Sequence, residues 1–125
     1  MNIKIIYLRA GSEFSKFITA WASKLDIQTE EYDDKGEGLG AEGLLLINEN
    51  QDIEKDIEDL HSQFYKKHYP TQKIDVNGTL QVAVSNFNIW LKNFNCQEIL
   101  IIGSNNLVKN DNLERFFDSL DSNDS

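Results

Sequence analysis

Residues 3–25, with the sequence IKIIYLRAGSEFSKFITAWASKL, contain the pattern that decides the fold. Ile3 to Leu8 is a nearly continuous apolar run of the length typical of a buried parallel strand. A turn from Arg9 to Ser12 follows it. From Glu13 onward the apolar residues recur at the three- and four-residue spacing of one helical face, and Ser12 is a suitable N-cap. The stretch therefore predicts a strand, a turn and a helix.

The rest of the chain repeats this alternation. Two further buried strands are predicted at Leu44 to Ile47 and Ile99 to Ile102, and two more polar strands at Ile27 to Asp33 and Lys73 to Val76. Asp34 to Gly43 holds four glycines and is predicted to be a loop. Three sets of apolar residues have helical spacing: Ile53, Ile57, Leu60 and Phe64; Leu80, Val84, Phe87, Leu91 and Phe94; and Leu113, Phe116, Phe117 and Leu120.

Residues 72–84 admit two interpretations. Asn77-Gly78 between alternating apolar residues is a strong hairpin signal, which would pair Lys73 to Val76 with Thr79 to Val84. The helical spacing that begins at Leu80 extends over four turns and is the longer pattern. The sequence therefore favours a strand followed by a helix.

This alternation predicts an α/β fold, a three-layer sandwich with a five-stranded, mostly parallel sheet of flavodoxin-like or Rossmann-like type. Parallel strands need helical crossovers, and right-handed crossovers cover both faces of the sheet. We expect the strand order 2-1-3-4-5. Because Ile99 to Ile102 is more apolar than Lys73 to Val76, an order with the last strand inside and the fourth at an edge stays open. Residues 1–120 are expected to form one domain, and residues 121–125 a frayed acidic tail.

Length and composition fit one soluble domain. The chain has 125 residues, and 40% of them are hydrophobic, which is sufficient for a single core. Its apolar runs are far shorter than the roughly 20 residues that span a bilayer, and Ile5 to Leu8 is too short for a secretory signal. Cys96 is the one cysteine and is interpreted as an ordinary thiol, since no disulfide can form within the chain. A cytoplasmic location is expected.

Negative charge is concentrated in one part of the chain. The net charge is −9, and residues 26–59 hold thirteen acidic against two basic side chains. Phosphate backbones and anionic lipid surfaces would be repelled, so neither nucleic acid nor a membrane is expected as a partner. A basic protein is the partner that such a segment would attract.

A ligand site is expected beyond the carboxyl ends of the strands, where open parallel sheets bind ligands. Amides, hydroxyls and free backbone N–H groups at these ends suit a nucleotide or a sugar phosphate. Arg9 is the strongest single candidate for binding an anionic ligand, because it is one of two arginines and lies where a strand leads into a helix. An ion pair with an acidic side chain is the alternative role for Arg9. The predicted ligand-binding residues at these ends are Arg9, Ala10, Gly11, Ser12, Asn48, Asn77, Gly103 and Ser104.

Other motifs carry less weight. Residues 38–43 match GxGxxG letter for letter, but they precede a strand, so a phosphate would meet no helix N-terminus there. Asp33 and Asp34 could hold magnesium, although solvated carboxylates are the ordinary interpretation, and no metal is predicted. His61 and His68 are expected on one helix, seven residues apart, which is too far for a zinc pair. No cofactor is predicted.

The segment Ile6-Tyr7-Leu8-Arg9-Ala10-Gly11 with Phe14 resembles the opening of the nucleoside 2-deoxyribosyltransferases, whose first strand runs into a YLAGP-like turn. Those enzymes share a flavodoxin-like core with TIR domains. The resemblance covers about a tenth of the chain, and the turn here lacks the proline. It implies Tyr7, together with Ala10 and Gly11, as pocket residues.

Two hypotheses for the function follow. The first is a small non-catalytic signalling or protein-interaction domain with an acidic surface, because charge is concentrated without any catalytic constellation. The alternative is a nucleotide- or nucleoside-binding domain with Arg9 in its pocket. The resemblance extends this alternative to a deoxyribosyltransferase-like or NAD-processing enzyme, and the sequence names no catalytic residue.

Overall fold

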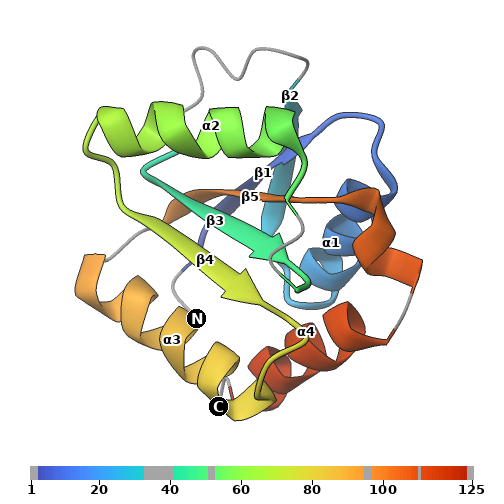
Figure 1. Ribbon diagram of the computed structural model, residues 1–125. Helices are drawn as coiled ribbons and strands as arrows, with labels where there is room; N and C mark the ends of the chain where they lie inside the picture. The colour runs from blue at the N-terminus through green and yellow to red at the C-terminus, as the bar shows by residue number, and fades with distance from the viewer. Residues whose placement is uncertain (1–2, 33–40, 51–52, 95–96, 110, 124–125) are drawn as a thin grey trace.

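The computed structural model describes residues 3–32, 41–50, 53–94, 97–109 and 111–123 of the chain (Figure 1). In chain order the elements are β1 (Ile5–Arg9), α1 (Glu13–Lys24), β2 (Gln28–Tyr32), β3 (Gly43–Asn48), α2 (Lys55–Lys66), β4 (Thr71–Asp75), α3 (Leu80–Phe94), β5 (Glu98–Gly103), the 3₁₀ helix η1 (Asn105–Lys109) and α4 (Asn112–Asn123).

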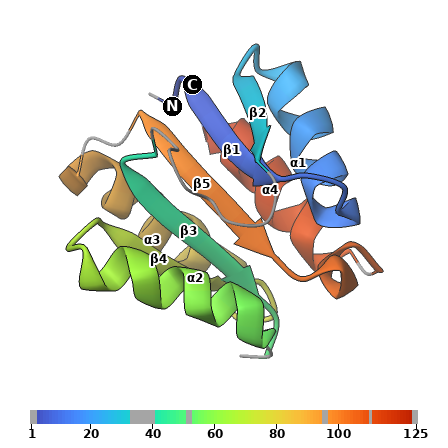
Figure 2. The ribbon, with the colours of Figure 1, turned by 90° about the horizontal axis from the view of Figure 1, so that it is seen from above.

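The strands form one sheet in which every pairing is parallel. Helix α2 covers one face of this sheet, and α1, α3 and α4 cover the opposite face (Figure 1, Figure 2). The predicted three-layer α/β sandwich with a parallel sheet is therefore confirmed.

The strand order is β2-β1-β5-β3-β4, so the expected order 2-1-3-4-5 is wrong. Strand β5 lies in the middle because Ile99 to Ile102 are apolar toward both faces, and none of them is more than 3% exposed. Strand β4 lies at an edge of the sheet, a position that suits polar residues such as Gln72 and Lys73. Strand β2 forms the other edge with Glu30 and Glu31 exposed. The alternative drawn from the apolar character of the last strand is the correct one.

The helices largely follow their predicted boundaries. Helix α3 begins at Leu80, so the hairpin interpretation of Asn77-Gly78 is wrong. Helix α4 continues to Asn123, past the predicted domain end at residue 120. Helix α2 ends at Lys66, so His68 does not share a helix with His61; its φ of 64° places it in the left-handed region beyond the C-cap.

The sheet has a hydrophobic core on each face. The core under α1, α3 and α4 is rich in aromatic rings, with Trp21 and Phe117 at a centroid distance of 4.7 Å and Phe116 and Phe117 at 5.1 Å. These rings meet edge to face, the favourable arrangement for aromatic pairs. The core under α2 is smaller, and its buried residues are Tyr7, Ala41, Leu44, Leu46, Ile57, Phe64, Leu100 and Ile102.

Across the described ranges, no helix combines the length and apolar character that a bilayer span requires.

Candidate functional site

Three of the predicted site residues line one pocket. Arg9 at the end of β1, Ser12 at the start of α1 and Gly103 at the end of β5 all contribute to it. The pocket has an internal volume of about 90 Å³. Its other lining residues are Phe14, Ser15, Asp56, Ile57, Leu60, Gln63, Ile101 and Ile102.

The position of this pocket follows from the strand order. From β1 the chain moves to the β2 edge by way of α1, and from β3 it moves to the β4 edge by way of α2. Helices α1 and α2 lie on opposite faces of the sheet (Figure 2), and the pocket lies where their residues meet the end of β5. Ligands in open α/β sheets bind at this kind of switch point. The prediction that Arg9 and Gly103 lie at the same end of the sheet is confirmed.

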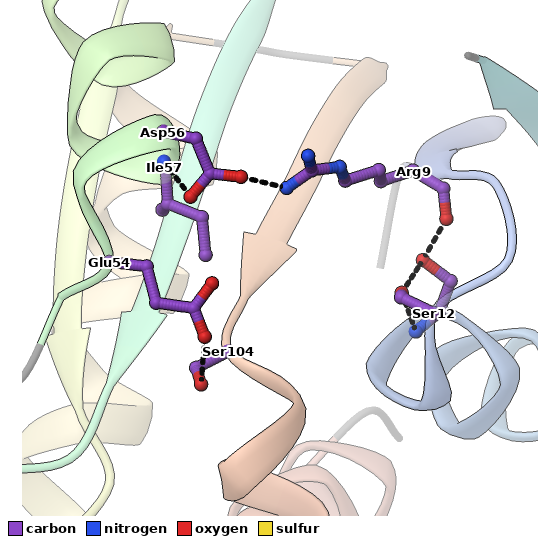
Figure 3. Close-up of polar contacts among 7 residues, drawn as sticks. Arg9, Ser12, Glu54, Asp56, Ile57 and Ser104 are labelled. Atoms are coloured by element: carbon purple, nitrogen blue, oxygen red, sulfur yellow. Dashed lines mark hydrogen bonds and ion pairs between the residues drawn. The ribbon is translucent and has the colours of Figure 1, made fainter. Parts of the chain in front are cut away.

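Arg9 crosses the pocket to α2. Its Nη1 donates a hydrogen bond to Oδ2 of Asp56, and the two side chains form an ion pair (Figure 3). The backbone N of Ile57 donates to the other carboxylate oxygen at 2.9 Å. The hydrogen bond from Arg9 is the main reason that the pKa of Asp56 lies below its ordinary value, and the charge of Arg9 adds to the effect. Arg9 therefore forms the ion pair with an acidic side chain that the sequence offered as its alternative role, and this pair lies at the pocket.

This ion pair is accessible to water. The side chain of Arg9 is 43% exposed and that of Asp56 is 48% exposed. Exposed pairs of this kind contribute only about 0–1 kcal/mol to folding. The guanidinium can therefore exchange Asp56 for another anion at small cost.

A second contact ties α2 to the end of the sheet. Ser104 Oγ donates to Oε1 of Glu54 at 2.8 Å (Figure 3), and it accepts a hydrogen bond from the backbone N of Asn106. Glu54 is the N-cap residue of α2 and is exposed. Ser104, a predicted site residue, thus lies beside the pocket and extends its polar rim.

The turn after β1 is held by two serines. Ser12 Oγ accepts a hydrogen bond from the backbone N of Ser15 at 3.0 Å, which confirms the predicted N-cap of α1. Ser15 is buried, and its Oγ donates to the carbonyl oxygen of Arg9. Gly11 has a φ of 79°, a conformation that disfavours other residues. These bonds fix the backbone of Arg9 at the rim.

Gly103 is a glycine because of packing. A Cβ atom there would lie 2.7 Å from Cε2 of Phe14 and 2.8 Å from Cδ1 of Leu107. Such distances are far inside van der Waals contact. The glycine therefore lets α1 and η1 pack closely against the end of β5, and Phe14 and Gly103 both line the pocket.

Three predicted residues lie away from the pocket lining. The hydroxyl of Tyr7 donates to Oε1 of Glu98 at 3.0 Å, at the start of β5, which is the opposite end of that strand from Gly103. Ala10 and Gly11 are exposed in the turn and do not line the pocket. Tyr7, for which the resemblance implies a pocket role, packs under α2 and does not line this pocket.

Asn48 and Asn77 belong to a separate amide cluster at the ends of β3 and β4. Asn48 is buried, and its Nδ2 donates to the carbonyl oxygen of Ile74 at 3.3 Å. Asn77 Nδ2 donates to Oδ1 of Asn50, and Asn112 of α4 donates to Oδ1 of Asn77 at 3.4 Å. This network holds the β4 edge to α4, and its residues are not among those that line the Arg9 pocket.

The remaining candidates form no site in the described residues. No group of three His, Cys, Asp or Glu side chains in the described ranges is arranged to hold a metal ion. Asp33, Asp34 and Cys96 lie outside those ranges, as do residues 38–40 of the GxGxxG match. Gly43, the last glycine of that match, begins β3.

Asp56, which lines the pocket, and Glu54, which accepts the hydrogen bond of Ser104 beside it, are two acidic residues of the site that sequence reasoning missed. They lie in an acidic helical stretch whose charges look like an ordinary solvated face. The usable signal is their position: both begin the helix that follows β3, and helix starts meet the carboxyl edge of a parallel sheet.

No protein-family model matches this chain, and no curated protein matches it. Among solved structures it is similar to the crystal structure described as "Putative molybdenum carrier protein" from Syntrophus aciditrophicus SB. The TM-score is 0.77, the match covers 99% of this chain and 96% of that chain, and 14% of the residues are identical. At this identity the likeness shows the α/β fold alone. That fold is of the general type expected from the sequence. The likeness gives no support for membership of the deoxyribosyltransferase and TIR group.

Proposed function

We propose that the Arg9 pocket binds a small polar ligand of the nucleotide, nucleoside or sugar-phosphate class. The observation that carries this proposal is the convergence of Arg9, Ser12 and Gly103 on one pocket at the switch point of the sheet. These residues come from separate elements, and the fold brings them together at the place where parallel sheets bind ligands.

The lining of the pocket suits a ligand with two different parts. Phe14, Ile57 and Leu60 offer an apolar wall, while Arg9 and Asp56 offer a cation and a carboxylate. The guanidinium can bind a phosphate or another oxyanion in two-pronged fashion, and the carboxylate accepts hydrogen bonds from hydroxyl groups. The interior of about 90 Å³ holds one such group, and the rest of the ligand extends over the exposed Arg9–Asp56 rim.

A thermal-shift series tests this proposal. The ligands are nucleosides, nucleoside monophosphates, sugar phosphates, inorganic phosphate and, because the similar structure is described as a molybdenum carrier, molybdate. A ligand at about 100 times its Kd stabilises the fold by about 2.7 kcal/mol, which raises Tm by several degrees. We expect at least one phosphate-bearing ligand to do so.

The control uses the chain's other arginine. Arg9→Ala is expected to weaken binding about tenfold or more, because it removes the cation of the pocket. Arg115→Ala on α4 removes an equally charged, exposed side chain elsewhere and is expected to leave the shift unchanged. Absence of any shift at millimolar ligand, or an equal shift in the Arg9→Ala protein, contradicts the proposal.

The finer hypothesis of a deoxyribosyltransferase-like or NAD-cleaving activity rests on the short resemblance around the first strand. It is checked by chromatography of the nucleoside samples and of a further sample incubated with NAD, since either reaction releases a free base from a nucleoside or from NAD. A ligand that binds and stays chemically intact would contradict the enzymatic hypothesis and leave ligand binding as the function.

A second candidate function is docking of a basic protein on the acidic surface. The observation that favours it is exposed carboxylates in two places: Glu54, Glu58 and Asp59 at the N-cap and in the first turns of α2, and Glu30 and Glu31 on the β2 edge. A field of one sign accelerates association with an oppositely charged partner and is screened by salt. Partner binding that ignores ionic strength contradicts this candidate. Two double variants give a further test: Glu58→Gln/Asp59→Asn on α2, and Glu114→Gln/Asp118→Asn on α4 as the control. Equal partner affinity of these two variants also contradicts this candidate.

A further inference from the structure

Arg9 and Asp56 are the two charged side chains among the described residues that line the pocket. Their charges cancel, and the two groups are in direct contact (Figure 3). The carboxylate is ionised at neutral pH, because the hydrogen bond from Arg9, together with the charge of Arg9, keeps the pKa of Asp56 below its ordinary value. An oxyanion that approaches Arg9 therefore meets a negative charge that is already in place.

The serine hydroxyls of the pocket do not offset this negative charge. Each hydroxyl has a single hydrogen to donate. Ser12 donates its hydrogen to Oγ of Ser15 at 2.7 Å, and Ser15 donates its own to the carbonyl oxygen of Arg9. Sites that bind a bare phosphate instead offer several backbone N–H groups and cationic side chains. The lining is therefore poor in donors for an oxyanion that has no other group to contribute.

Asp56 is held at the pocket independently of Arg9. Its Oδ1 accepts a hydrogen bond from the backbone N of Ile57 at 2.9 Å. An oxyanion that displaces Asp56 from the guanidinium therefore still lies close to the carboxylate. Two like charges at such short range repel each other, whereas a hydrogen-bond donor on the ligand satisfies the carboxylate.

We infer that Asp56 makes the pocket selective for a ligand that carries a hydroxyl group next to its oxyanion, and against an oxyanion without such a donor. This inference rests on the proposed function and narrows its ligand class to hydroxyl-bearing phosphate esters. A guanidinium has five N–H groups, so Arg9 can bind the phosphate and Asp56 together while the ligand hydroxyl donates to Asp56. Asp56 is thus the specificity-determining residue of the pocket.

The position of Asp56 on α2 fits this role. Asp56, Leu60 and Gln63 follow one another at intervals of four and three residues and all line the pocket, so they lie along one line of the helix. Leu60 is partly buried and packs against the core under α2, whereas Asp56 is exposed. The carbon skeleton of a ligand can therefore lie against Leu60 while its hydroxyl groups reach the carboxylate.

Isothermal titration calorimetry at about pH 8 with ribose 5-phosphate and methyl phosphate tests this inference. The second pKa of a phosphate ester is about 6, so the two ligands carry the same charge and differ in the hydroxyl-bearing sugar. The wild-type chain is expected to bind ribose 5-phosphate about tenfold more tightly, the factor that one hydrogen bond to a charged group provides. Asp56→Asn is expected to bind methyl phosphate about tenfold more tightly than the wild type does, because the like charge is removed, and so to lose most of the preference.

Two further ligands show whether the phosphate ester is a nucleotide or a sugar phosphate. Adenosine monophosphate is expected to bind the wild-type chain more tightly than dideoxyadenosine monophosphate, which lacks the sugar hydroxyls, and Asp56→Asn is expected to reduce this difference. Adenosine monophosphate that binds more tightly than ribose 5-phosphate identifies a nucleotide site, and the reverse order identifies a sugar-phosphate site.

The matched control is Asp59→Asn, which removes an equal charge from an exposed position of α2 that is not among the pocket-lining residues. It is expected to keep the preference of the wild type. Circular dichroism of each variant confirms that it is folded.

Equal wild-type affinity for ribose 5-phosphate and methyl phosphate overturns the inference and leaves ligand binding as the function. So does a preference that Asp56→Asn leaves unchanged, or one that Asp59→Asn reduces equally. If no ligand binds the wild-type chain or Asp56→Asn, the proposed function itself is contradicted, and the inference with it.

Discussion

The two faces of the sheet are covered in different ways. Helices α1, α3 and α4 cover one face with a continuous aromatic core, while α2 is the one helix of the described residues on the other face. On the well-covered face the rings of Trp21, Phe116 and Phe117 fill the space between the helices. On the other face, charged side chains of α2 reach across to the ends of the strands. We therefore expect the first face to supply more of the stability, whereas the pocket lies at the strand ends, lined by residues of both α1 and α2.

The largest expected difference between the faces is in core substitutions. Phe116→Ala is expected to lower the free energy of unfolding by about 3–5 kcal/mol, because the ring is 0% exposed and other rings surround it. Phe64→Ala on α2, where the ring is 8% exposed, is expected to cost about 2–3 kcal/mol, because a single helix can relax toward the sheet. Urea unfolding of both variants measures this difference. Equal losses would contradict the asymmetry.

A smaller loss of stability is expected from a substitution at Gly103, at the end of β5 beside the pocket. Gly103→Ala is expected to lower the free energy of unfolding by about 1–3 kcal/mol, because the new methyl group displaces Phe14 and Leu107. Gly78→Ala is the matched control, since a Cβ there comes only within 3.5 Å of the carbonyl oxygen of Asp75. It is expected to change stability by less than about 0.5 kcal/mol. Thermal unfolding of the two variants side by side measures the contrast.

The smallest effect is expected from the ion pair across the pocket. The pKa of Asp56 is lower in the folded chain than its ordinary value of 3.8. Its contribution is therefore complete above pH 3.8 and is lost as the pH falls through the folded-state pKa. Because both side chains are more than 40% exposed, that contribution is about 0–1 kcal/mol.

Asp56→Asn should accordingly lower the unfolding free energy slightly at neutral pH and leave it unchanged in strong acid. Unfolding curves of wild type and variant at several pH values measure the difference. A loss that persists in acid, or one of several kcal/mol, would show that Asp56 acts by other means than its pair with Arg9.

Much of the fold could be predicted because it rests on local patterns. The apolar runs of β1, β3 and β5, the cap at Ser12 and the spacing of α3 each specify an element without reference to the rest of the chain. The strand order could not be fixed in the same way, because it depends on contacts between distant segments. Only the apolar character of Ile99 to Ile102 pointed toward the centre of the sheet.

The candidate site shows the same division. Arg9, Ser12 and Gly103 could be predicted, since each lies at or just after the end of a strand and so must lie at the carboxyl edge. Asp56 could not, because it is 47 residues from Arg9 and looks like any solvated carboxylate. Asn48 and Asn77 also lie at this edge, but they pair with neighbouring amides and backbone groups. The position of a residue along its strand therefore predicts that it lies at the carboxyl edge of the sheet. It does not predict which side chain that residue contacts there.

The central place of β5 has a consequence for synthesis of the chain. Strands β1 and β2 pair with each other, as do β3 and β4, and in the sheet of the described residues β5 lies between the two pairs and joins them. While the ribosome has released only residues before Glu98, the nascent chain holds two separate strand pairs, and two-stranded units are marginal in water. Cooperative closure must wait until β5 has emerged, so premature termination before that point leaves both halves exposed to proteases and to aggregation.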